Sequence, residues 1–158
     1  MLELSEKVKE NFFNPKNTGE MDNPDGMGAI ENPICGDITK LFLRIRNGLI
    51  EDAKFLSFGC AVTIASASVF TEKIKGKEIS FLLSGEDEEI IKRLMGLIED
   101  ELGGIPAAKL HCPPATVEVF LKAMVSYFER EGDKNLSQRI KEIIPKIKEY
   151  YQRGEEKI

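Results

Sequence analysis

Three cysteines, one histidine and one aspartate are the residues of this chain best suited to chemistry. All the cysteines and the only histidine of the 158 residues stand in three short motifs, Ile34-Cys35-Gly36-Asp37, Phe58-Gly59-Cys60 and Leu110-His111-Cys112. An odd number of cysteines without an export signal argues against a disulfide framework and favours metal binding or catalysis. Three thiolates with either Asp37 or His111 make a four-ligand site, and such soft donors select zinc, Cu(I) or iron–sulfur clusters.

The same residues have other interpretations. The cysteines lack the paired Cys-x-x-Cys spacing of zinc ribbons, and a free cysteine is often only a small buried hydrophobe. An aspartate after a glycine is commonly a turn residue. A further hypothesis is a nucleophilic triad of Cys112, His111 and Asp37 for acyl transfer, which leaves Cys35 and Cys60 without a role. Residue types alone leave these alternatives open.

Composition and charge narrow the class of protein. The net charge of −5 argues against a nucleic-acid partner, which needs a basic face to neutralise phosphates. The chain holds no apolar run long enough for a membrane span. Its start lacks the basic and apolar regions of a signal peptide, so we expect a cytoplasmic protein with no membrane partner. With 42% hydrophobic residues, the chain is expected to form one globular domain.

Apolar periodicity predicts the elements that position these residues. We expect helices over residues 4–13, 61–75, 84–102, 113–131 and from 136 onward, with Pro145 kinking or splitting the last. Strands are expected near 27–31 and over 40–46 and 49–58, the last two joined by the hairpin turn Asn47-Gly48. Cys60 and Cys112 would then lie at helix N-termini, where the helix dipole favours a thiolate.

Several short motifs together resemble the IscU/NifU-type iron–sulfur cluster assembly scaffold family. They are Asn14-Pro15-Lys16-Asn17, Cys35-Gly36-Asp37, Phe58-Gly59-Cys60 with Ala65-Ser66-Ala67-Ser68, Lys75-Gly76-Lys77 and Lys109-Leu110-His111-Cys112. The resemblance implies an α+β fold, with a small three-stranded antiparallel sheet packed against several helices. We expect a scaffold domain over residues 1–132, with residues 133–158 as an extra C-terminal amphipathic helix of the same domain.

The resemblance also implies a function. Members are scaffolds or carriers rather than enzymes: they accept sulfur from a cysteine desulfurase, build a labile [2Fe-2S] cluster with iron, and transfer it to apo-proteins. Cys35, Cys60 and Cys112 match the cluster cysteines of the family, Asp37 matches its metal-binding aspartate, and His111 matches the histidine beside the third cysteine. Because sulfur acceptance favours an exposed thiol of low pKa, we expect Cys112 to be the first acceptor.

A related branch of the family provides the alternative function, a zinc-containing sulfurtransferase that relays persulfide sulfur. It would use Asp37 and the three cysteines to hold Zn²⁺. His111 favours the scaffold, whereas the long interval between Cys60 and Cys112 favours the sulfurtransferase. The resemblance also implies two further kinds of partner, a frataxin-like iron donor and other copies of the same chain in a homo-oligomer. Residues 103–109 lack the Leu-Pro-Pro-Val-Lys motif that an Hsp70-type chaperone recognises in some members, which argues against that partner.

Overall fold

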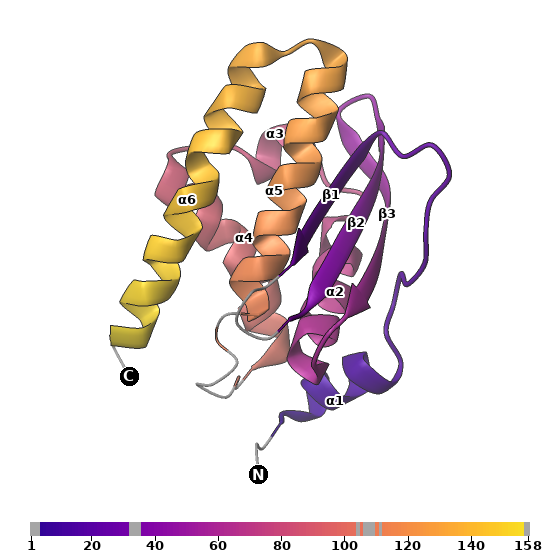
Figure 1. Ribbon diagram of the computed structural model, residues 1–158, viewed down its shortest axis with the longest axis vertical. Helices are drawn as coiled ribbons and strands as arrows, with labels where there is room; N and C mark the ends of the chain where they lie inside the picture. The colour runs from indigo at the N-terminus through magenta and orange to yellow at the C-terminus, as the bar shows by residue number, and fades with distance from the viewer. Residues whose placement is uncertain (1–3, 32–35, 104, 106–109, 111, 157–158) are drawn as a thin grey trace.

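The computed structural model describes residues 4–31, 36–103, 105, 110 and 112–156, with side chains described as far as Glu149. Figure 1 shows a small sheet with helices gathered on one side of it. The elements in chain order are α1 (Glu6–Phe13), β1 (Gly26–Glu31), β2 (Ile38–Arg46), β3 (Leu49–Phe58), α2 (Ala61–Ile74), α3 (Ile79–Leu82), α4 (Asp87–Leu102), α5 (Cys112–Glu131) and α6 (Lys134–Glu156).

The sheet has three antiparallel strands in the order β1-β2-β3, which confirms the predicted fold class. Strands β2 and β3 meet at the predicted hairpin, where Arg46 pairs with Leu49. Asn47 and Gly48 both take positive φ angles, 54° and 74°, as the tight turn between two twisted strands requires. The loop before β1 lies along β3, where the N–H of Phe55 donates to the carbonyl of Asn17. That loop covers a strand edge that would otherwise face solvent.

Helix α5 packs directly on β1 (Figure 1). Two glycines of β1 allow this contact, because they place no side chain between the strand and the helix. A Cβ added at Gly26 would lie 2.6 Å from the carbonyl oxygen of Ala123, and one added at Gly28 would lie 2.7 Å from the Ala123 nitrogen. Both contacts are well inside van der Waals separation. This close approach brings the start of α5 to the end of the sheet near β2.

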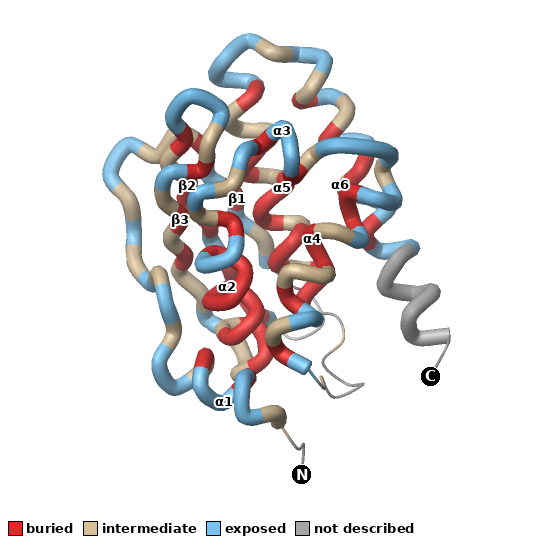
Figure 2. Tube along the Cα trace, turned by 180° about the vertical axis from the view of Figure 1, so that it is seen from behind, coloured by how far each residue is buried: buried red, intermediate tan, exposed pale blue. Residues whose placement is uncertain are grey.

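Helix α2 lies at the centre of the molecule, and Figure 2 shows it buried along most of its length. Ten of its fourteen residues are buried, so it is a core helix rather than a surface one. Small residues allow its close packing: the Ser68 hydroxyl donates to Asn11 of α1 and accepts from the Lys16 backbone N–H. These two hydrogen bonds tie the middle of α2 to α1 and to the loop that follows α1.

Helix α6 runs back along α5 after a turn at Gly132, whose φ is 80° (Figure 1). Ile140, Ile143 and Ile147 are buried in the common core, on both sides of Pro145. The prediction that Pro145 splits this helix is wrong, because apolar packing holds both halves in place and proline removes only one backbone donor. The predicted boundary at residue 132, between a scaffold domain and a C-terminal helical extension, stays a prediction.

Two local predictions between α2 and α4 also need correction. The helix predicted over residues 84–102 begins later, at Asp87, with Glu86 as its N-cap, and the Ser84 hydroxyl donates to the Phe81 carbonyl instead. Helix α3 was not predicted, since four residues are too few to show helical periodicity. Among the helices of the described chain, none is both long and apolar enough to cross a membrane.

Candidate metal-binding site

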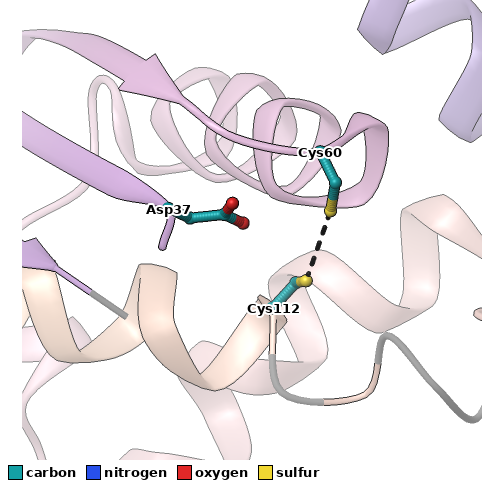
Figure 3. Close-up of side chains that lie close together, drawn as sticks. All are labelled: Asp37, Cys60 and Cys112. Atoms are coloured by element: carbon teal, nitrogen blue, oxygen red, sulfur yellow. Dashed lines mark hydrogen bonds between the residues drawn. The ribbon is translucent and has the colours of Figure 1, made fainter. Parts of the chain in front are cut away.

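Three of the five residues singled out in the sequence meet at one end of the sheet. Asp37 precedes β2, Cys60 is the N-cap of α2, and Cys112 is the first residue of α5. One carboxylate oxygen and the two sulfur atoms lie within 4.8 Å of one another. Figure 3 shows the carboxylate pointing toward the two thiols. Cys35 and His111, the other two predicted ligands, lie outside the described residues.

The backbone between β3 and α2 determines where Asp37 lies. Strand β3 ends at Phe58, Gly59 makes the link, and Cys60 opens α2. A Cβ at Gly59 would lie 2.7 Å from the carboxylate carbon of Asp37 and 2.9 Å from its Oδ2. The φ of Gly59 is not left-handed, so the glycine is needed for space rather than for backbone conformation. The buried carboxylate of Asp37 therefore packs against the α-carbon of Gly59, in the space that a larger residue would fill.

The two thiols form a hydrogen-bonded pair, with their Sγ atoms 3.7 Å apart (Figure 3). The bond from Cys112 lowers the pKa of Cys60 far below its usual value, against the opposing effect of burial, and the backbone N–H groups of Thr63 and Val62 lower it further. The same bond, together with burial and the negative charges of Cys60 and Asp37, raises the pKa of Cys112. The two pKa values move in opposite directions, so at neutral pH the pair holds one proton between its two sulfur atoms.

This distribution corrects one prediction from the sequence. Cys112 was expected to be an exposed thiol of low pKa, but it is 1% exposed and its pKa is raised, whereas Cys60 is half-buried. The physical reason is that Cys112 lies within the first turn of α5 and faces the core, where it donates to Cys60. Cys60 is the N-cap of α2, where the helix dipole favours a thiolate, and its pKa is lowered as that position predicts.

Thr63 belongs to this site, and the sequence analysis missed it. Its hydroxyl donates to Asp37 Oδ2 over 2.6 Å and lies 3.4 Å from the sulfur of Cys60. A threonine three residues after an N-cap cysteine lies in the same first turn as that cysteine. This spacing could have identified the contact with Cys60. The contact with Asp37 could not be predicted in this way, because Asp37 lies 26 residues away in the sequence, just before β2.

The rim of the site is apolar. Ile38 and Phe58 pair across β2 and β3, next to Asp37 and Gly59, and Phe58 is 76% exposed. Two sulfur donors and one oxygen donor therefore converge at the edge of the core, close to solvent. Carboxylate and thiolate together suit zinc, iron or a cluster of iron and sulfur. A bound cation would lower the pKa of Cys112 and complete a set of three anionic ligands.

A small antiparallel sheet covered by helices, with an aspartate and two cysteines converging at one end, defines an α+β protein with a candidate thiolate metal site. The chain belongs to the family of the NifU-like N-terminal domain, whose model matches residues 3–134. This confirms the family resemblance read from the motifs. The family match covers the sheet, the helices α1 to α5 and all five predicted ligands.

Individual relatives extend the comparison. The chain is 37% identical over 152 residues to iron-sulfur cluster assembly scaffold protein IscU 1 of Archaeoglobus fulgidus, covering 96% of this chain and 92% of the relative. It is 34% identical to the IscU scaffold protein of Aquifex aeolicus, covering 98% and 90%. Both alignments cover so much of this chain that they include most of α6, so the sequence of this helix has a counterpart in these relatives.

A solved structure supports the same fold. The N-terminal region of a NifU-like protein from Brucella abortus superposes with a TM-score of 0.59, covering 79% of this chain and 94% of that one. The sequences are 17% identical, so this similarity bears on the fold alone.

Proposed function

We propose that this protein is an iron–sulfur cluster assembly scaffold, which builds a cluster from iron and sulfur and passes it to apo-proteins. The observation that carries the proposal is the convergence of Asp37, Cys60 and Cys112 at the solvent edge of the core. The names of the Archaeoglobus and Aquifex relatives describe the same function. The cluster is cargo, so the protein acts as a carrier rather than as an enzyme with turnover, and we place it in the cytoplasm.

The ligand set we propose for the [2Fe-2S] cargo is Cys35, Cys60 and Cys112, with Asp37 or His111 as the fourth donor. Cys35 stands two residues before Asp37, and His111 directly precedes Cys112. A set with one oxygen or nitrogen donor holds iron less firmly than four thiolates do. Such a site, at the edge of the core, suits a protein that must both assemble a cluster and release it.

Sulfur acceptance is proposed at Cys112. Its thiol must first lose its proton to solvent, and a bound cation would favour that loss because it would lower the pKa of the thiol. The Cys112 thiolate then attacks the outer sulfur of a persulfide on the desulfurase. The persulfide S–S bond breaks, and the desulfurase cysteine leaves as a thiolate. Cys60 is the competing acceptor, because its pKa is lowered and it is the more exposed of the two.

The proposed partners follow from this chemistry. A cysteine desulfurase supplies the sulfur, an iron donor of the frataxin type supplies the metal, and apo iron–sulfur proteins take the product. The exposed Phe58 and Ile38 border the site, where a delivering or receiving protein would have to approach.

A zinc-containing sulfurtransferase is the second candidate. The observation that favours it is the same donor trio, because one carboxylate and two thiolates also form a common zinc ligand set. In that case Zn²⁺ stays bound and one thiol relays persulfide sulfur.

Anaerobic reconstitution with iron, a cysteine desulfurase and cysteine separates the two functions. The scaffold should develop the visible absorption of a [2Fe-2S] centre, which fades as added apo-ferredoxin gains its own cluster. A colourless protein that keeps stoichiometric zinc while accepting labelled sulfur would refute the scaffold and establish the sulfurtransferase. Cys35→Ala should abolish cluster binding, whereas an acyl-transfer triad of Cys112, His111 and Asp37 would be unaffected by it.

Mass-spectrometric mapping of the first persulfide decides the acceptor. The modification is expected on Cys112 in the wild type. Persulfide confined to Cys60 would show that the more exposed cysteine is itself the nucleophile, and the assignment of Cys112 as the acceptor would then be wrong.

A further inference from the structure

Thr63 is a polar side chain that the assembly chemistry does not use, yet it lies between two of the proposed ligands. It is 4% exposed, in the first turn of α2. Its Oγ1 lies 2.6 Å from Oδ2 of Asp37 and 3.4 Å from Sγ of Cys60. A buried hydroxyl placed this close to both side chains can determine how the Asp37 carboxylate is oriented in the site.

The hydroxyl has one proton and cannot donate it to both neighbours. A separation of 2.6 Å is typical of a charge-assisted O–H···O⁻ hydrogen bond, which is about twice as strong as a neutral one. The contact with sulfur is longer, and there the oxygen offers only its lone pairs once the proton has gone to Asp37. The hydroxyl is therefore committed to the carboxylate.

This hydrogen bond fixes the orientation of Asp37. On one side the carboxylate packs against the α-carbon of Gly59, and on another its Oδ2 accepts from Thr63. With Oδ2 engaged in a strong hydrogen bond, the carboxylate is held in one orientation relative to the two thiols. Hydrogen bonds of this kind to metal ligands set the ligand's orientation, and losing one typically reduces metal affinity about 10- to 100-fold.

We propose that Thr63 is a positioning residue that orients Asp37 as a metal ligand, through the hydroxyl hydrogen bond to Oδ2. The inference rests on the proposed metal-binding role of Asp37, Cys60 and Cys112. It adds that the ligand geometry of this site depends on a side chain of α2 that does not touch the metal.

Anaerobic Co²⁺ titration followed by optical spectroscopy tests the role of Thr63 without any cluster assembly. Thr63→Val keeps the shape of the side chain and removes the hydroxyl, and we expect about 10- to 100-fold weaker Co²⁺ binding. The d–d bands should shift as water replaces the carboxylate, while the thiolate-to-cobalt charge-transfer intensity stays unchanged. Thr63→Ser should retain wild-type affinity and bands.

Two further variants distinguish positioning from general loss of stability. Thr71→Val removes another fully buried hydroxyl of α2, one that donates to the Ala67 carbonyl far along the helix, and should leave Co²⁺ binding unchanged. In an Asp37→Ala background, adding Thr63→Val should cause no further loss of affinity, because Thr63 acts through Asp37. Thr63→Ala takes the place of the valine variant if that variant does not fold.

The outcomes separate this inference from the proposed function. Wild-type affinity and bands in folded Thr63→Val would overturn the role of Thr63 while leaving the metal site intact. Equal losses in the valine and serine variants would also overturn it, since they would point to methyl packing rather than to the hydroxyl. A wild-type protein that binds no Co²⁺ with thiolate bands would overturn the metal site itself.

Discussion

Substituting Gly59 by alanine tests whether the position of Asp37 depends on close packing. The added Cβ would lie 2.7 Å from the Asp37 carboxylate carbon, and apolar contacts are comfortable only near 3.5–4.0 Å. The carboxylate must therefore move by about 1 Å. Metal–ligand bond lengths tolerate only about ±0.2 Å, so Asp37 would be displaced as a ligand while both thiols remain.

We expect Gly59→Ala to weaken Zn²⁺ or Co²⁺ binding by about 10- to 100-fold, equivalent to about 1.4–2.8 kcal/mol. The apo protein should lose about 1–3 kcal/mol of unfolding free energy through overpacking. Metal affinity is measured by competition with a chromophoric chelator, and stability by urea unfolding. Gly96→Ala is the matched control, because its added Cβ would meet nothing closer than Asp100 Oδ2 at 3.7 Å. Because Gly96 lies within α4, where alanine favours the helix, this change should stabilise the protein by about 1 kcal/mol and leave the metal affinity unchanged.

Unchanged metal affinity in folded Gly59→Ala would refute the reasoning. Either Asp37 would not be a ligand, or its position would not depend on the space left by the glycine. The variant Asp37→Ala distinguishes these cases, because a loss of affinity there restores Asp37 as a ligand and leaves only the packing argument wrong.

Three other substitutions test separate parts of the structure. Gly28→Ala would press a methyl group into the α5 backbone at Ala123 and should cost about 3 kcal/mol in urea unfolding; a cost under about 1 kcal/mol would contradict the close helix–sheet contact. Cys112→Ala removes the hydrogen bond that lowers the pKa of Cys60. The pH midpoint of Cys60 alkylation should therefore move upward toward the usual thiol value. An unchanged midpoint would exclude a proton shared between the two cysteines. Ile143→Ala should destabilise the whole protein by about 2–5 kcal/mol in a single transition, whereas a separate early transition would make α6 a loosely attached lid.

Local sequence patterns determined most elements of the fold. Apolar periodicity placed the helices, alternation placed the strands, and Asn47-Gly48 identified the hairpin, because each signal depends on residues that are neighbours along the chain. The signals failed where they were too short or were overridden by packing. Helix α3 is only four residues long, and buried isoleucines on both sides of Pro145 keep α6 continuous.

The sequence by itself also determined which residue types were available for metal chemistry, and motif order identified the family. Only the tertiary structure decided that Asp37, Cys60 and Cys112 converge, and that Thr63 joins them. It also decided that Cys112 is the buried thiol and Cys60 the half-buried one, reversing the expectation that Cys112 is exposed. The physical reason is that hydrogen bonding and charge interactions act over a few ångströms in space, and these distances depend on how β2, α2 and α5 pack against one another.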